Sequence, residues 1–273
     1  MARREIADTF RIPDELWERV QLFLPRFPRQ KTGRPRLEPR KVVDGIFYIL
    51  RTGCQWKAAP SEFGSGSTLH DYFQKFVARG FFRDLWEAGL FEYESLKGIK
   101  WDWQSIDGAM TKAPLGGKKT GPNPTDRAKS GTKRSLLTDG AGVPLSVVVD
   151  GANTHDKRLV ERTLEEIVAP RPRPSRSDPQ HFCGDKGYDY PDTRELVEEY
   201  GYTLHIKSRG DEARDLRAVP RYRARRWVVE RTHSWLNRFR RLLIRWEKKA
   251  DNFLAMLHFA CAYITFRAAG LFG

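Results

Sequence analysis

Three acidic residues occupy positions from which carboxylates far apart in the sequence can meet. Asp107 ends a strand predicted over residues 100–107. Asp185 follows a short predicted strand, and Glu230 lies inside a strongly basic helix. Side chains at strand ends and on a facing helix can converge on one point. Carboxylate oxygens are the ligands that magnesium prefers, and two such ions can stabilise the attacking and leaving oxygens of a phosphodiester. The trio therefore indicates metal-assisted phosphoryl transfer, although each acid could instead cap a helix or pair with a nearby base.

The helix around Glu230, predicted over residues 222–246, has two distinct faces at a period of 3.6 residues. The polar face carries Arg226, Glu230, His233 or Ser234, Asn237 and Arg241. The opposite face, expected to point into the core, carries Val228, Trp235, Phe239, Leu242 and Trp246. A single carboxylate among several arginines is either a catalytic ligand or the centre of an ion-pair cluster. The helix alone does not decide between the two.

The net charge of +14 over 273 residues indicates a polyanionic partner, because solubility alone needs only a modest charge. The positive charge is concentrated in three basic blocks, at 26–41, 112–134 and 207–249, around an acidic stretch at 83–110. Phosphate contacts fix the position of a protein on DNA without reading sequence. Candidates for such contacts are Arg34, Arg36, Arg40 and Lys41 in the first block and Lys207 in the last.

The predicted elements change in character near residue 97. Helices come first, at 13–24, 39–51, about 69–77 and 81–96. The pattern then predicts a strand at 100–107, a hairpin of 135–138 and 143–150, a helix at 156–168, strands at 181–184 and 203–208 on either side of a helix at 191–200, and closing helices at 222–246 and 251–268. We therefore expect an all-α, helix-turn-helix-like region over 1–97 and an α/β region, with a mixed sheet flanked by helices, over 98–273. The helical region is expected to bind DNA, with dimerisation or packing onto the α/β region as alternatives.

The cysteines and the apolar stretches indicate the compartment. Cys54, Cys183 and Cys261 show no paired spacing, so we expect a reducing cytoplasm and no disulfides. The first residues lack the apolar core of a signal peptide. The most apolar stretch, 253–266, is too short to span a bilayer and is expected to be a buried helix. These features predict a cytoplasmic protein associated with the nucleoid and no membrane partner.

Two other chemistries are weaker alternatives. A zinc site would use His155, His181, Cys183 and His233, but no two of these have the close spacing of a structural site. A covalent recombinase would use a hydroxyl nucleophile such as Ser105, Tyr188 or Tyr190. The acidic pattern fits metal-assisted chemistry better than either.

Several motifs together resemble one family. The C-terminal signature of bacterial insertion-sequence transposases, in the grouping of insertion sequences four and five, is similar to RWVVERTHSWLNRFRRL at 226–242. The segments that bear the first and second Asp of that family are similar to SIDG at 105–108 and GDKGYD at 184–189. The insertion-sequence-five branch also resembles this chain in TGPNPTDR at 120–127, TKRSLL at 132–137, RTGCQW at 51–56 and GRPR at 33–36.

What the resemblance implies is a DDE transposase with a ribonuclease-H-like catalytic fold. The triad falls on Asp107, Asp185 and Glu230, which would bind Mg²⁺ or Mn²⁺. The implied substrate is double-stranded DNA: the terminal inverted repeats of a mobile element, which are cut and joined to target DNA. Because two element ends must be brought together, a homodimer on DNA is expected.

The family also carries the pattern Tyr-x2-Arg-x3-Glu-x6-Lys around its Glu, and this chain departs from it. Arg226 and Glu230 keep the Arg-x3-Glu step. Tyr222 stands one residue too early, and Asn237 stands where the Lys is expected, with Arg238 one position later. The DNA-contact residues implied here are Arg226, Asn237, Arg238 and Arg241.

Two rival functions remain open at this level. One is a catalytically inactive, domesticated DNA-binding protein, against which three acidic triad positions argue. The other is a nuclease on the same fold that cuts without joining, since two metal ions would serve both reactions.

Overall fold

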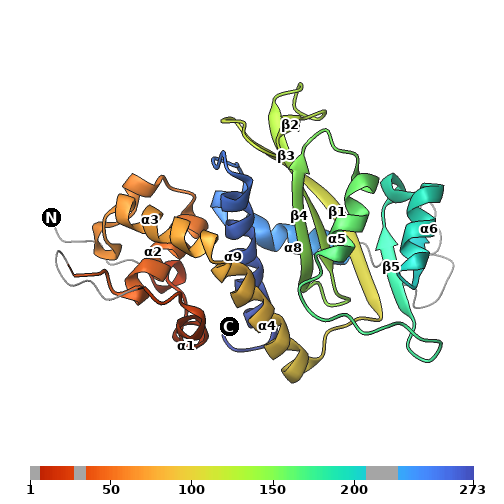
Figure 1. Ribbon diagram of the computed structural model, residues 1–273, viewed down its shortest axis with the longest axis horizontal. Helices are drawn as coiled ribbons and strands as arrows, with labels where there is room; N and C mark the ends of the chain where they lie inside the picture. Colours follow the sequence, from red (N-terminus) through yellow and green to blue (C-terminus); the bar gives the residue numbers. More distant parts are fainter. Residues whose placement is uncertain (1–6, 28–34, 207–226) are drawn as a thin grey trace.

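The computed structural model describes residues 7–27, 35–206 and 227–273 (Figure 1). Its first part is helical, as expected, and consists of α1 (Asp14–Phe23), α2 (Pro39–Thr52), α3 (Gly66–Ala78) and α4 (Phe81–Lys97), with short 3-10 turns between them. Pro39 opens α2, where its missing N–H costs nothing, and Gly53 closes it with a φ of 73°. Ser65 caps α3 by accepting a hydrogen bond from the Thr68 amide.

The second part is built on a six-stranded mixed sheet. The strands are β1 (Trp103–Lys112), β2 (Gly121–Pro122), β3 (Ser130–Thr138), β4 (Pro144–Gly151), β5 (Gln180–Gly184) and β6 (Tyr202–Ile206). Their order is β2-β3-β1-β5-β6, and β4 pairs with β3. The β3–β1 and β3–β4 pairs are antiparallel, whereas β1–β5 and β5–β6 are parallel. This strand order and the helices on both faces confirm the predicted α/β class, with a mixed sheet flanked by helices.

Both faces of the sheet are buried, and adjacent residues of one strand enter different cores because side chains alternate along a strand. Leu136 of β3 belongs to the larger core, which also contains residues of α8 (Trp227–Asn237) and α9 (Ala250–Ala268). Leu137 belongs to a smaller core beneath α5 (Val160–Glu165) and α6 (Pro191–Glu199). The sheet therefore separates an α8/α9 side from an α5/α6 side.

The helical part and the sheet share the larger core. This core runs from Leu16 of α1 through Phe47 of α2 and Trp86 of α4 to Phe259 of α9 and Val147 of β4. Figure 1 shows α4 and α9 side by side between the N-terminal helices and the sheet. Helix α9 is apolar nearly all round because α4 covers one side and the sheet covers another. The division at residue 97 falls at the end of α4 and stays a prediction.

Two predicted elements differ from the structure in their ends. Strand β1 does not stop at Asp107 but continues to Lys112, because β3 offers backbone partners as far as Gly131. The helix predicted to reach residue 246 ends at Asn237 and is followed by a 3-10 turn, η6 (Arg240–Leu242). Beyond that turn, Ile244 forms a bridge to Lys112 beside β1. Long-range backbone pairing overrides local periodicity at both places.

A buried arginine holds the chain beyond η6. Arg245 is 1% exposed and donates hydrogen bonds to the carbonyl oxygens of Lys118, Lys119 and Glu247. These bonds tie the segment to the loop between β1 and β2, so the chain cannot continue as a helix there. Trp246, predicted to face the core, is 42% exposed as a consequence. Within the described ranges, no helix is long and apolar enough to cross a membrane.

Candidate active site

Asp107 and Asp185 lie on neighbouring parallel strands. The last register pair between β1 and β5 joins Ser105 to Cys183, and each Asp follows two residues later. They therefore reach equivalent positions on the same face of the sheet. Asp185 also begins a short 3-10 turn, where its Oδ1 accepts a hydrogen bond from the Gly187 amide at 2.8 Å. The sheet register thus brings together two residues that are distant in sequence.

Glu230 reaches the same region from α8, which packs across β1 and β3. Two side chains tie this helix to the turn between β3 and β4. The Thr232 hydroxyl donates to the Gly142 carbonyl at 2.7 Å, and Arg231 donates to the Ala141 carbonyl. Glu230 lies on the exposed side of α8. It borders an open groove, called the acidic groove below, whose lining includes Asp107, Arg134, Glu230, His233 and Asn237.

The electrostatics of Asp107 show that the acidic residues act on one another. Burial, together with the charges of Asp185, Glu230 and Asp156, raises the pKa of Asp107 to about 7 against the lowering effect of the Gly108 amide. Like charges disfavour the ionised carboxylate in this way, and a cation would relieve the repulsion. Among the residues that the structure describes, no three acidic, His or Cys side chains already stand close enough to hold one metal ion. The carboxylates therefore share a negative field without forming a closed ligand shell.

A buried arginine and histidine support Asp107, and the sequence analysis did not identify this network. Arg134 of β3 is 3% exposed. It donates from Nε to Nδ1 of His233 at 3.2 Å and from Nη2 to Oδ1 of Asn237 at 2.7 Å. Because Nδ1 accepts, a neutral His233 carries its proton on Nε2, which lies 3.6 Å from Oδ2 of Asp107. His233 is neutral because burial, followed by the nearby Arg134 charge, lowers its pKa to about 3.

The positive charge of this network is retained at neutral pH. Burial lowers the pKa of Arg134 to about 10, and the charge of Asp107 opposes this shift. Arg134 lies opposite Ala109 on β1, two residues from Asp107 on the same face of the sheet. A fixed cation therefore stands close to the acidic groove, inside the protein. In the sequence, the only sign of this arrangement is the alternation of side chains along β1 and β3. That alternation places Arg134 beside Asp107 only when the pairing of the two strands is already known.

Asp156 is a fourth acidic residue near Asp107 that the sequence analysis missed. Its Oδ2 accepts from Lys133 Nζ at 3.0 Å. Its Oδ1 lies over Gly108, where an added Cβ would come within 2.2 Å of that oxygen. A side chain at position 108 would therefore require the Asp156 carboxylate to move. In the sequence, the glycine that follows Asp107 was the only sign of this contact, and it did not indicate that Asp156 is the residue in contact.

The residues predicted to contact DNA in the helical part are partly engaged within the protein. Arg40 donates to the Ile12 carbonyl and pairs with Asp14 and Asp44, so it joins α1 to α2. Lys41 is exposed and pairs with Glu38 at 3.2 Å. The Arg36 guanidinium stands over the ring of Phe27. Arg34, Lys207 and Arg226 lie outside the described residues.

The predicted DNA-contact residues at the end of α8 separate into three environments. Asn237 is exposed, borders the acidic groove and accepts the bond from Arg134. Arg238 is exposed. Arg241 is 6% exposed, pairs with Glu247 at 2.7 Å and donates to the Cys54 carbonyl. The prediction that Arg241 shares a polar face with Glu230 is wrong, because the helix ends before it.

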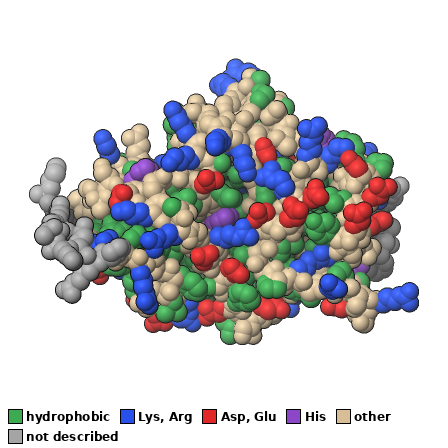
Figure 2. All heavy atoms as spheres, viewed as in Figure 1, with side chains coloured by type: hydrophobic (Ala, Val, Ile, Leu, Met, Phe, Trp, Pro, Cys, Tyr) green, Lys and Arg blue, Asp and Glu red, His purple; other side chains and the backbone are tan. Residues whose placement is uncertain are grey.

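Acidic and basic side chains are unevenly distributed over the surface. Figure 2 shows acidic side chains gathered over α5 and α6, and Lys and Arg side chains over the N-terminal helices and the centre of the molecule. The two acidic helices contribute Glu161, Glu165, Asp192, Glu195, Glu198 and Glu199. DNA approaching the α5/α6 side would be repelled.

Comparison with known proteins identifies the family. A family model described as a transposase DDE domain matches residues 101–265, and one described as a putative transposase of the IS4/5 family matches residues 12–86. The chain is 39% identical over 153 residues to the putative transposase for insertion sequence element IS402 of Burkholderia cepacia, which covers 55% of this chain and 69% of that protein. An uncharacterized 16.2 kDa protein of the same element is 30% identical over 118 residues, or 41% of this chain and 80% of that protein.

Among solved structures, the Mos1 transposase catalytic domain with Raltegravir and Mg matches with a TM-score of 0.30 and 14% identity, over 69% of this chain and 93% of that one. This TM-score and identity are too low to support a fold assignment, which therefore depends on the sheet topology of this chain. The two family models together cover both its helical and its α/β parts. The chain belongs to the DDE transposases of the IS4/5 family of insertion sequences.

Proposed function

We propose that this transposase binds the terminal inverted repeats of its element and catalyses metal-dependent DNA cleavage and strand transfer, with Asp107, Asp185 and Glu230 as metal ligands. The observation that carries the proposal is the placement of these carboxylates, which come from two adjacent strands and the helix across them. Burial is the main cause of the pKa of about 7 at Asp107, and the charges of Asp185 and Glu230 add to it. Such a concentration of negative charge costs free energy in the folded chain unless a cation binds.

The donor set fits Mg²⁺ or Mn²⁺. Carboxylate oxygens are hard ligands suited to both ions. Asp107 and Asp185 are fixed by the sheet, whereas Glu230 is exposed and can change rotamer to complete the ligand set. When bound, divalent ions would activate the attacking oxygen and stabilise the leaving oxygen of the phosphodiester.

Arg134 and His233 are proposed to position Asp107. The Arg134–His233 bond fixes the imidazole ring, so that its Nε2–H faces the carboxylate. At 3.6 Å this contact is longer than a hydrogen bond, so the Nε2–H would act on the ligating carboxylate as a nearby dipole that orients it and tunes its basicity. Asn237, held by Arg134 at the edge of the groove, offers an exposed amide where the family pattern carries a Lys. A neutral amide can hydrogen-bond a phosphate or base but supplies no charge.

Double-stranded DNA is the proposed substrate, and a homodimer on DNA the proposed active species. The +14 net charge and the basic side chains away from α5 and α6 support a polyanionic partner. Acting on DNA in a bacterial cell would place the protein with the nucleoid in the cytoplasm. Gel filtration with light scattering, in the presence of element-end DNA, tests the dimer; a complex that contains a single chain and a single end at all concentrations would contradict it.

The central experiment is cleavage and joining of labelled element-end DNA in Mg²⁺. Wild type is compared with the near-isosteric variants Asp107→Asn, Asp185→Asn and Glu230→Gln, and with Glu195→Gln as a control on the acidic surface of α6. We expect joined products from wild type and from the control, and DNA binding without cleavage from the three site variants. Full activity of any site variant would remove that residue from the proposed triad.

The same experiment distinguishes the rival functions. A nuclease would cut the labelled ends in Mg²⁺ but give no strand-transfer product with added target DNA. A DNA-binding protein without catalysis would shift the labelled DNA in a gel and leave it intact in both Mg²⁺ and Mn²⁺.

A further inference from the structure

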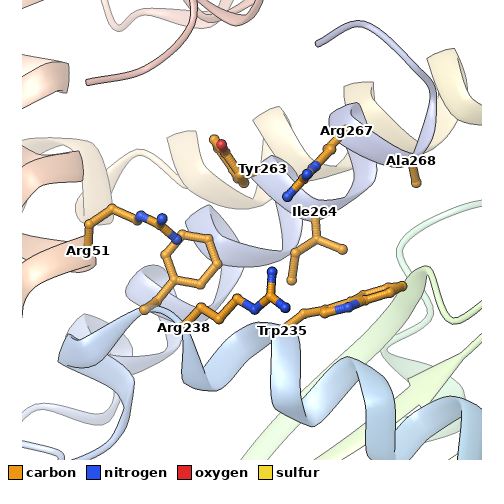
Figure 3. Close-up of a pocket in the computed structure, with 8 residues that line it drawn as sticks. Arg51, Trp235, Arg238, Tyr263, Ile264, Arg267 and Ala268 are labelled. Carbon is orange, nitrogen blue, oxygen red and sulfur yellow. The ribbon is translucent and has the colours of Figure 1, made fainter. Parts of the chain in front are cut away.

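Three arginine side chains from separate parts of the chain meet at one pocket, called the arginine pocket below. Arg51 comes from the end of α2, Arg238 follows α8, and Arg267 lies in the last turn of α9 (Figure 3). The cavity has a volume of about 330 Å³. Its remaining lining is Trp235, Phe239, Tyr263, Ile264 and Ala268. No local sequence pattern links these three arginines.

The three guanidinium groups have no acidic partner among the residues that the structure describes. Some other described surface arginines do have one; for example, Arg19 pairs with Glu92 and Arg162 with Asp150. Arg51 instead stands over the ring of Phe239, with its guanidinium carbon 5.1 Å from the ring centroid. Three like charges around one cavity repel one another and create a positive potential there. An anion is the ligand that this arrangement favours.

The floor of the pocket is apolar and fixed by packing. Phe239 is 2% exposed, and the ring of Tyr263 lies 5.2 Å from that of Phe47 and 5.7 Å from that of Phe239. Trp235 is held on one side by Arg231, whose guanidinium carbon is 4.8 Å from the ring centroid. Such a floor suits the sugar that adjoins a phosphate, and arginine can bind a phosphate through two parallel hydrogen bonds. A phosphodiester group satisfies both halves of the pocket better than a simple inorganic ion.

The pocket lies next to the acidic groove. Asn237 lines the groove, and the following residue, Arg238, lines the pocket. Glu230 and Arg238 are eight residues apart, and the seven steps that lie within α8 correspond to about 10 Å along its axis at 1.5 Å per residue. With the step to Arg238 added, that distance corresponds to about three to four base-pair steps of 3.4 Å along duplex DNA whose axis is parallel to α8. A DNA strand that places one phosphodiester at the carboxylates can therefore place another at the arginines.

We propose that the arginine pocket binds a backbone phosphate of the element-end DNA, about three to four base pairs from the scissile bond. This inference rests on the proposed function, because it assumes that the end DNA crosses the acidic groove. It adds Arg51 and Arg267 to the DNA-binding surface. Because Arg51 belongs to the helical part and Arg267 to the last helix, bound DNA would bridge the two ends of the chain.

The test measures the affinity of the full chain for element-end duplex over a range of salt concentrations. The variants are Arg51→Gln, Arg238→Gln, Arg267→Gln and their triple combination, with Arg194→Gln as a control that removes one positive charge from the acidic surface of α6. Each neutralised phosphate contributes about 0.9 to the slope of log affinity against log salt, so we expect the triple variant, which loses one phosphate contact, to lose about 0.9 of the slope. The control should change the slope little.

A second measurement locates the contact. Ethylation of single phosphates in the end DNA should weaken wild-type binding at one position about three to four base pairs from the cleavage site, and Arg238→Gln should be insensitive to ethylation there. Arg238→Lys keeps the charge but loses the paired hydrogen bonds. Its sensitivity to ethylation is expected to lie between those of wild type and Arg238→Gln.

The outcomes separate this inference from the proposed function. If wild type neither binds nor cleaves end DNA, the proposed function fails first. If wild type binds and cleaves while the triple variant keeps the wild-type salt slope and interference pattern, the arginine pocket is not a DNA site. Thermal unfolding of each variant checks the fold, and the single variant of the exposed Arg267 provides the same readout if the triple variant does not fold.

Discussion

The acidic groove and the arginine pocket adjoin the same helix, α8, yet they carry charge in opposite ways. In the groove, Arg134 and His233 are buried and bonded to each other, and His233 faces Asp107. In the pocket, Arg238 and Arg267 are exposed and have no acidic partner among the described residues. A buried charge is costly unless neighbouring groups compensate it, whereas a surface charge is compensated by water until a ligand arrives. The groove is thus built to fix groups in place, and the pocket to attract a ligand.

The largest expected effect is on catalysis in the groove. Asp107→Asn removes the carboxylate of a proposed metal ligand while keeping the shape of the side chain. Metal ions contribute several kcal/mol of transition-state stabilisation, so we expect cleavage of end DNA to fall about a thousandfold or more. Single-turnover cleavage with labelled DNA measures the loss. If the groove and the pocket act separately, the affinity of this variant for DNA should stay within about threefold of the wild-type affinity. A threefold change in affinity corresponds to less than about 1 kcal/mol of binding free energy.

Arg241 and Arg238 sharpen the comparison because they are three residues apart and differ in burial. Arg241→Ala leaves Glu247, which is 7% exposed, without its charged partner. Removing one member of a buried pair costs about 3–5 kcal/mol of unfolding free energy. Arg238→Gln, at the surface, should change it by no more than about 0.5 kcal/mol. Urea unfolding measures both, and equal losses would mean that burial does not distinguish these two arginines.

The raised pKa of Asp107 predicts that stability depends on pH in the absence of metal. The folded chain holds this proton up to a pH of about 7, whereas an ordinary Asp loses it near 3.8. The stabilisation by the proton is complete below a pH of about 4 and is lost as the pH rises to about 7; at about 1.36 kcal/mol per pKa unit it amounts to at most about 4 kcal/mol. Asp107→Asn should therefore gain stability relative to wild type on going from pH 5 to pH 8.

Urea unfolding of both proteins at each pH, with a chelator present, measures this difference. Other buried acids, such as Asp44 and Asp139, also have raised pKa values, so only the difference between wild type and variant isolates Asp107. Adding Mg²⁺ should reduce the pH dependence of wild type, because a bound cation favours the ionised carboxylate. An unchanged difference between pH 5 and pH 8 would contradict the assigned environment of Asp107.

The smallest expected effect concerns the positioning of Asp107 by His233. His233→Ala leaves the Nε donor of Arg134 without its acceptor and is expected to cost about 1–3 kcal/mol of stability. Loss of a group that orients a metal ligand typically costs about 10–100-fold in metal affinity or activity. His233→Asn keeps an acceptor near the place of Nδ1 but loses the donor that faces Asp107. His233→Asn should recover the stability of wild type but should still need a higher Mg²⁺ concentration than wild type for half-maximal cleavage. Recovery of both wild-type values would assign His233 a purely structural role.

Local periodicity predicted most elements because each one buries a recognisable face. The hairpin of β3 and β4, strand β5, helix α6 and the apolar helix α9 lie where the pattern placed them, within a few residues. The pattern was wrong where long-range contacts override it. Pairing with β3 extends β1 past Asp107, and the bonds of Arg245 to the loop before β2 redirect the chain after α8.

The candidate site divides in the same way. Asp107, Asp185 and Glu230 could be singled out from residue type, predicted elements and motif resemblance, and their roles stay predictions. The supporting residues could not be identified, because Arg134, Asp156 and His233 become neighbours of Asp107 only through strand pairing and helix packing. Arg241 was misplaced for a related reason, since the end of α8 depends on contacts made far away in sequence.

By itself, the sequence determined the family, the mixed α/β class with its helical beginning, and the positive charge that indicates a polyanionic partner. These properties follow from composition, which is a sum over all residues, and from local periodicity and short motifs, each of which lies within a few consecutive residues. Only the tertiary structure decided which charges are buried and paired and which remain open to a ligand. Burial and pairing depend on the distance between atoms of remote segments, and in this chain that distance is set by the register of β1 with β3 and β5 and by the packing of α8 and α9 against them.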